Sequence, residues 1–182
     1  MKKIILFRKA IFMVLFTICI STGIVKAQDS KDERLIDDSK NAKTAFIKTD
    51  ELSQSLFNNS YGYVIFPNVG KGAVGVGGAA GSGIVYEKGK MAGSAKMTQI
   101  TIGAQIGGQA FREVIFFENK AELDRFKEGK FEFAAQTSAV ALTSGVSANA
   151  KYRDGVLVFT QEKSGLMYEA SVGGQKFSYT PF

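Results

Sequence analysis

The sequence predicts an α+β fold: a curved antiparallel β-sheet or partial barrel with short N-terminal helices and one inserted helix. Residues 98–108 alternate apolar and polar side chains, which is typical of a half-buried strand. Twelve glycines lie between Gly70 and Gly108, and the Ile, Val and Ala residues among them indicate sharply bent, closely packed strands. Residues 29–60 are polar, with apolar positions at helical spacing.

Two short helices are expected within residues 29–60, the second opened by Thr49 or Asp50 as its N-cap. We expect them to pack on the domain, because their acidic residues match their lysines, whereas helices that lie on a membrane favour a basic polar face. Membrane docking is the alternative. The inserted helix has Asn119 as N-cap and Glu122 in a capping box, and it ends at Gly129. The apolar positions of these helices are Leu35, Ala42, Phe46, Leu52, Leu56, Phe57, Leu123 and Phe126.

The strands are expected to begin after Tyr61, where β-branched and aromatic residues replace the helical pattern. A turn is predicted at Lys88-Gly89-Lys90, and Gly173-Gly174 suits the two-residue turn of a tight hairpin. The alanine-rich stretch 134–142 fits a helix equally well. Further strands are expected at Arg112–Glu118, Phe131–Thr137, Ala139–Ala148, Gly155–Thr160, Leu166–Val172 and Gln175–Thr180.

The first 27 residues have the organisation of a secretory signal peptide. Basic residues precede an apolar run at residues 11–20, and Val25-Lys26-Ala27 offers small residues for cleavage. The run is short for a bilayer span, so we expect a cut after Ala27 rather than an anchor. Residues 28–182 are then expected to form a single domain in the periplasm, at the envelope or outside the cell.

Charge and composition exclude several classes of function. Five of the 23 basic residues and none of the 17 acidic ones precede residue 28, which leaves 18 basic residues against 17 acidic ones. This balance argues against nucleic-acid binding, which needs clustered Lys and Arg. The single cysteine is Cys19, and the chain has no histidine and no tryptophan. We therefore expect no disulfide, no metal site, no cofactor, no catalytic residue and no enzymatic activity.

Two apparent motifs carry no chemistry in this interpretation. Residues Gly75–Ala80 fit the dinucleotide pattern G-x-G-x-x-G/A, but the pattern needs a helix directly after the glycines and none is predicted there. Carboxylates on predicted strands, such as Glu113 and Glu118, are interpreted as solvated residues, because the sequence does not place two of them across a scissile bond.

Three segments resemble the SYLF-domain family in the same order and spacing: GYVIFPNVGKGAVGVGGAAGSG (Gly62–Gly83), ITIGAQIGGQAFREVIFFENKAELDRF (Ile100–Phe126) and GLMYEASVGGQKF (Gly165–Phe177). The resemblance covers roughly residues 40–180. It implies a lipid-binding domain: eukaryotic members bind phosphoinositide membranes, some also bind actin filaments, and exported bacterial members are thought to bind lipids or fatty acids. Actin binding is not expected of an exported chain with no second module.

Two designs for lipid binding fit the sequence. In one, glycine-lined strands leave an apolar groove for an acyl chain, with Gly103 and Gly107 on the ligand face. In the other, lysines at turn tips contact lipid headgroups while an apolar neighbour enters the interface. The candidates for this second design are Lys71, Lys88, Lys90 and Lys96, with Tyr86 and Met91 as neighbours.

The sequence thus predicts an exported, non-enzymatic domain that binds anionic phospholipid or fatty acid at the cell envelope. A structural or adhesive envelope protein without a ligand is the first alternative. An outer-membrane β-barrel is the second, suggested by the signal peptide, the alternating strands and the terminal Phe182. The helices and Pro181, expected to break the last strand, argue against the barrel. No oligomeric state is predicted.

Overall fold

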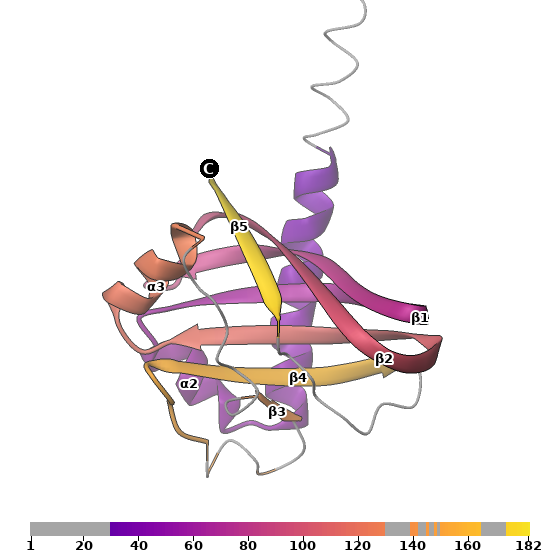
Figure 1. Ribbon diagram of the computed structural model, residues 1–182. Coiled ribbons are helices and arrows are strands. Elements are labelled where there is room, and N and C mark those ends of the chain that lie inside the picture. The colour runs from indigo at the N-terminus through magenta and orange to yellow at the C-terminus, as the bar shows by residue number, and fades with distance from the viewer. Residues whose placement is uncertain (1–29, 130–138, 142–144, 146–147, 149, 165–173) are drawn as a thin grey trace, which may run out of the picture. The chain divides into compact units, whose positions relative to one another are not determined.

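The computed structural model describes residues 30–129, 139–141, 145, 148, 150–164 and 174–182 (Figure 1). The chain divides into two units, residues 1–36 and 37–182. In the first unit, residues 30–36 are helical, and Arg34 Nε donates a hydrogen bond to the Ser30 carbonyl oxygen. The second unit contains the sheet and the remaining helices.

The first helix is longer than the sequence predicted, and the second begins later. Residues 30–49 are all helical, and α2 spans Ser53–Asn59. Asp50 does cap the turn between them, because its Oδ1 accepts a hydrogen bond from the Leu52 N–H at 3.1 Å. The N-cap of α2 is nevertheless Leu52, which makes no side-chain bond there. The extra turn at residues 50–52 delays the start of α2 beyond the predicted Thr49 or Asp50.

The sheet is built around one long antiparallel hairpin. Strand β1 spans Gly62–Glu87 and β2 spans Lys90–Phe117, so the strands expected at 98–108 and at Arg112–Glu118 form one continuous strand. Lys88 and Gly89 join β1 to β2 with φ values of 49° and 76°, as a two-residue turn of type I′ requires. Irregularities in register at three places bend the hairpin, as the glycine pattern indicated.

The other strands pair with different parts of β2. Strand β4 (Val156–Ser164) pairs with residues 110–117 and β5 (Gln175–Pro181) with residues 93–99, both antiparallel. Strand β3 (Ala139–Ala141) is shorter than expected and pairs with β4 in parallel, which is the exception in the sheet. The result is an α+β fold with a curved, unclosed sheet across the described residues, so the predicted fold class is confirmed.

Two expectations about the strands need comment. Pro181 does not break the last strand: it is the final residue of β5 and pairs with Gly93. A strand end tolerates proline because a missing N–H there costs no central ladder bond. The strands expected at Phe131–Thr137 and Leu166–Val172 lie outside the described residues.

Apolar side chains cover both faces of the sheet. Between the two halves of the bent hairpin, an inner core gathers side chains from β1, β2, β4 and β5, with Leu123 and Phe126 of α3 (Lys120–Lys127) at one end. As predicted, Asn119 caps α3: its Oδ1 accepts from the Glu122 N–H at 3.1 Å, and Gly129 follows with φ 67°. Other members of this core include Val64, Phe66, Val69, Val85, Met97, Phe111, Ile115, Phe117, Val158 and Phe177.

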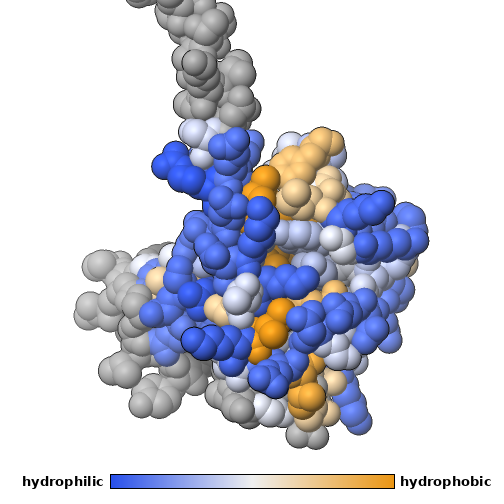
Figure 2. Space-filling model, turned by 180° about the vertical axis from the view of Figure 1, so that it is seen from behind, coloured by the Kyte–Doolittle hydropathy of each residue, from blue (hydrophilic) through white to orange (hydrophobic). Residues whose placement is uncertain are grey.

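The outer face of the sheet is covered by residues 37–49 of the first helix and by α2 (Figure 1). Ala42 and Phe46 are buried, and the Phe57 ring of α2 meets the rings of Tyr63 and Phe116 at centroid distances of 5.1 and 4.9 Å. In Figure 2, the exposed side of the helix is mainly hydrophilic. The apolar stripe of this helix therefore serves packing, as the sequence interpretation favoured.

None of the helices within the described residues is long and apolar enough to cross a membrane.

Candidate functional site

Glycines of β1 lie where the first and last parts of this bent strand touch. A Cβ atom on Gly83 would lie 2.5 Å from the Ile65 carbonyl oxygen, and one on Gly81 would lie 3.0 Å from Val69 Cγ2. These glycines let backbone and core side chains approach closely, so the space beside them is already filled. By contrast, Gly70 and Gly72 have no atom within 4 Å of such a Cβ.

Gly103 and Gly107 were predicted to lie on the ligand face of an acyl groove. Both lie in β2, Gly107 opposite Ala73 and Gly103 within the irregularity between the pairs Val74↔Ile106 and Val76↔Ile102. They occupy the bend of the hairpin rather than a separate strand. Their role in a groove remains a prediction.

The structure separates the four candidate lysines. Lys71 was expected at a turn tip, but it lies within β1 and is only 9% exposed, because Gly70-Lys71-Gly72 continues the strand instead of turning. Lys96 is exposed on β2 between Ser82 of β1 and Ser178 of β5. Lys88 and Lys90 are exposed and flank Gly89 at the turn, where they were predicted.

The aromatic and apolar neighbours also separate. Tyr86 was expected to reach a lipid interface, but it is buried: its ring stacks on Tyr63 at 4.8 Å, and its hydroxyl lies 3.3 Å from Ser39 Oγ. Tyr86 precedes the turn on the side of the sheet that the first helix covers. Met91 follows the turn and is 47% exposed.

The C-terminal residue lies at the same turn. The Phe182 N–H donates to the Ala92 carbonyl oxygen at 3.3 Å, and its side chain is 62% exposed. Within the described part of the chain, Leu52, Met91 and Phe182 are the large apolar residues that are most exposed. We call Lys88, Gly89, Lys90, Met91 and Phe182 the hairpin tip. Sequence reasoning missed Phe182 as a tip residue, because only the pairing of β5 with β2 brings it there.

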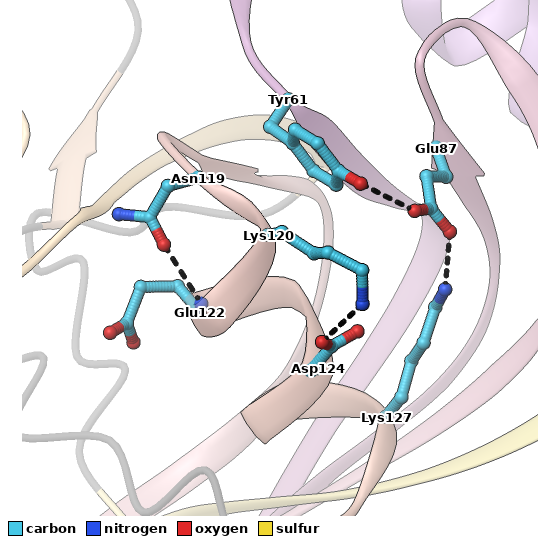
Figure 3. A network of polar contacts seen from close by, with 7 residues as sticks. All are labelled: Tyr61, Glu87, Asn119, Lys120, Glu122, Asp124 and Lys127. Carbon is cyan, nitrogen blue, oxygen red and sulfur yellow. Dashed lines mark hydrogen bonds and ion pairs between the residues drawn. The ribbon is translucent and has the colours of Figure 1, made fainter.

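Acidic side chains near the hairpin tip are paired with lysines of α3 (Figure 3). Glu87 accepts hydrogen bonds from Lys127 Nζ at 2.6 Å and from the Tyr61 hydroxyl at 2.9 Å, and these bonds lower the pKa of its carboxyl. Asp124 pairs with Lys120 at 2.5 Å. The two acidic groups are thus matched by two lysines of α3.

Lys88 and Lys90 remain as the cations of the tip. Among the residues that the structure describes, neither forms an ion pair, although Lys88 Nζ lies 5.2 Å from the centroid of the Tyr61 ring. The tip therefore carries a local positive charge next to exposed apolar side chains. Such a surface suits an anionic interface.

A second feature lies between the sheet halves and is polar. Glu113 was interpreted as a solvated carboxylate, but its side chain is fully buried on β2, and Gln175 of β5 donates to its Oε2 at 3.0 Å. Burial raises the pKa of Glu113 to about 7, while the Gln175 bond acts in the opposite direction. Gln99, the pairing partner of Gln175, is buried as well. The signal in the sequence is the position of Glu113 within the apolar run Phe111–Phe117.

Two further features of the described residues concern the dinucleotide-like pattern and metal binding. Residues Gly75–Ala80 run within β1, which continues to Glu87 and is followed by β2. The helix that a dinucleotide site needs directly after the glycines is therefore absent at this place. No group of three acidic side chains in the described residues is placed to hold a metal ion.

A comparison with known proteins shows a similarity over part of the chain. No protein-family model matches the chain. The chain is similar to beta cell expansion factor A of Aeromonas veronii, with 30% identity over 124 residues. The alignment covers 67% of this chain and 47% of that protein, so the chain spans about half the length of the relative it matches.

Proposed function

We propose that this chain is an exported, non-enzymatic member of the SYLF-domain family that binds anionic phospholipid membranes through the hairpin tip. The observation that carries the proposal is the presence of exposed Met91 and Phe182 beside Lys88 and Lys90. Apolar side chains that enter an interface and cations that meet anionic headgroups are the two components of peripheral membrane binding. The similarity of three ordered segments to the SYLF family supports the same function.

The size of the tip indicates weak, reversible binding. A lysine near an anionic surface contributes about 1 kcal/mol, so Lys88 and Lys90 together contribute about 2 kcal/mol. Met91 and Phe182 are already partly buried, and their insertion adds roughly 2 kcal/mol. A total of about 4 kcal/mol corresponds to a millimolar dissociation constant. Attachment by one tip therefore depends on low salt or on several copies acting together.

Along the part of the sheet that contains Gly81 and Gly83, the packing of the inner core favours the surface design over an acyl groove. The close contacts of Gly81 and Gly83 and the buried aromatic rings of Phe66, Phe117 and Phe177 occupy the space between the sheet halves. A bound acyl chain would need these side chains to move apart, which a close-packed core resists. Surface contact needs no such rearrangement.

Vesicle co-sedimentation tests the proposal. Residues 28–182 should sediment with vesicles of phosphatidylcholine and phosphatidylglycerol at low salt, and less with phosphatidylcholine alone. The double variant Lys88→Gln/Lys90→Gln should weaken binding by about 30-fold if each lysine contributes about 1 kcal/mol. Met91→Ser and Phe182→Ser should each weaken binding at any salt concentration.

Lys96→Gln is the matched control. This variant removes the same charge from an exposed lysine six residues along β2, roughly 20 Å from Lys90. Equal losses for Lys96→Gln and the tip variants would point to a diffuse charge effect and contradict the tip. A folded wild-type protein that binds neither vesicle would overturn the proposal and favour the structural or adhesive alternative.

Export is tested separately. Because residues 1–27 fit a signal peptide, the exported protein should begin at Gln28 on N-terminal sequencing. Recovery of the chain from the cell membrane with Met1 intact would contradict cleavage.

A further inference from the structure

Glu113 occupies an unusual position for a carboxylate. It lies on β2 opposite Phe66 of β1 and Thr160 of β4, and its side chain has no exposed surface. Taking an ionised carboxylate out of water is costly unless its oxygens accept several hydrogen bonds. The number of hydrogen-bond donors that reach Glu113 therefore decides whether its buried carboxyl group is ionised or protonated.

One donor reaches it from the described residues. Gln175 Nε2 donates to Glu113 Oε2 at 3.0 Å. Glu113 Oε1 is buried and receives no hydrogen bond from the described part of the chain, and the same holds for Gln175 Oε1. Within the described part of the chain, the two joined groups thus carry two buried acceptor atoms without donors.

A single proton can satisfy both atoms. If Glu113 Oε1 carries the proton, its O–H can donate to Gln175 Oε1 while Gln175 Nε2 donates to Oε2, and the carboxyl and the amide form a ring of two hydrogen bonds. This arrangement needs no space for a further ligand. An ionised Glu113 would leave both acceptors unpaired and a charge buried.

We propose that Glu113 is protonated in the folded protein and forms an acid–amide pair with Gln175 that holds the start of β5 on the sheet. Gln175 is the first residue of β5 and sits opposite Gln99 of β2, so its side chain joins β5 to the part of β2 that carries Glu113. Loss of the proton opens the pair and releases the start of β5. Proton concentration thereby controls how firmly β5 is held.

Among the described residues, no charged side chain is among the causes that shift the pKa of Glu113. The other charged side chains on these strands are Lys71 and Glu87 of β1, Lys90, Lys96 and Arg112 of β2, Glu162 and Lys163 of β4 and Lys176 of β5. Among the described residues, burial and the Gln175 amide are the influences on its ionisation, and burial is the larger: it raises the pKa to about 7. Arg112 is occupied by the Gln161 side chain, with Nη1 and Oε1 2.7 Å apart.

Hydrogen exchange of the β5 amides measures the proposed release. An exposed Glu113 titrates near 4.5 and the buried one near 7, so the protection of β5 amides should fall about tenfold per pH unit between these values and then level off. The total loss should be on the order of 300-fold, after correction for the intrinsic pH dependence of exchange. Glu113→Gln replaces the acid by an amide of the same shape, so β5 protection should not vary with pH in this window.

Glu162→Gln is the matched control, because it removes an exposed carboxylate from the neighbouring strand β4. It should retain the pH dependence of the wild type. A pH-independent protection of β5 in the wild type, or the same pH dependence in Glu113→Gln, would overturn the proposal.

Infrared spectroscopy of the wild-type protein adds a readout that does not depend on any variant folding. The C=O stretch of a protonated carboxyl should persist at pH 6, well above the ordinary pKa of glutamate, and disappear as the pH passes about 7. Its absence at pH 6 would show that Glu113 is ionised and would contradict the acid–amide pair.

Discussion

A Cβ atom on Gly83 would lie 2.5 Å from the carbonyl oxygen of Ile65, although both residues belong to β1 and are 18 positions apart. This contact exists because the bent hairpin brings the first and last parts of β1 together. The same approach is seen at Gly62, where a Cβ would lie 2.7 Å from the Tyr86 carbonyl oxygen. Glycine at these positions is a packing requirement.

Gly83→Ala should therefore destabilise the protein. The methyl group would overlap the Ile65 carbonyl, a backbone atom that cannot move alone, so we expect a loss of about 1–3 kcal/mol in the free energy of unfolding. Urea denaturation measures it. Gly72→Ala is the control: its methyl group meets no atom within 4 Å, and the change should be neutral or slightly stabilising. Equal losses in both variants would contradict the close contact.

The cap of α3 makes a second prediction. Asn119→Ala removes the Oδ1 that accepts the Glu122 N–H, and loss of such a cap costs about 1 kcal/mol. Asn58→Ala removes only an exposed side-chain bond to Gln54 and should change stability by less than about 0.5 kcal/mol. Thermal unfolding of the two variants compares them directly, and no difference between them would show that the cap contributes nothing.

The packing of the first helix makes a third prediction. Phe46 is fully buried against the sheet, so Phe46→Ala should reduce the free energy of unfolding by about 3–5 kcal/mol. Leu52→Ala, at a residue that is more than half exposed, should have little effect. If Phe46→Ala left stability unchanged and only reduced vesicle binding, the helix would be a membrane-docking element instead.

Glu113 makes the stability of the whole fold depend on pH. Its folded pKa of about 7 exceeds the ordinary 4.5, so the protein is most stable, as far as this group is concerned, below pH 4.5. Stability falls as the pH rises to about 7, by roughly 3 kcal/mol in total, because the unfolded chain ionises more easily.

Urea denaturation at a series of pH values measures this effect as the difference between the wild type and Glu113→Gln. The difference removes the contributions of the other titrating groups, such as Glu87, whose lowered pKa affects stability at more acidic pH. A difference that stays constant from pH 4.5 to 7 would mean that Glu113 titrates normally in the folded state.

Local patterns in the sequence were sufficient for several elements. The Asn119 cap, the inward side chains Leu123 and Phe126 and the stop at Gly129 depend on residues within one or two turns of each other. The Lys88-Gly89 turn is equally local, because Gly89 readily adopts one of the two positive φ values that the turn requires. The alternation of apolar and polar residues and the glycine content are also local features, and they predicted the curved sheet.

Only the tertiary structure decided which polar residues are buried and which apolar residues meet. Lys71 lies between two glycines and Glu113 within an apolar run, and neither local pattern shows how far the folded sheet buries the side chain. Phe182 reaches the hairpin tip only because β5 pairs with residues of β2 that lie 76 to 88 positions earlier in the chain. Alternation tells which side chains share a face of a strand, but not what lies against that face, because contacts between distant segments leave no local pattern.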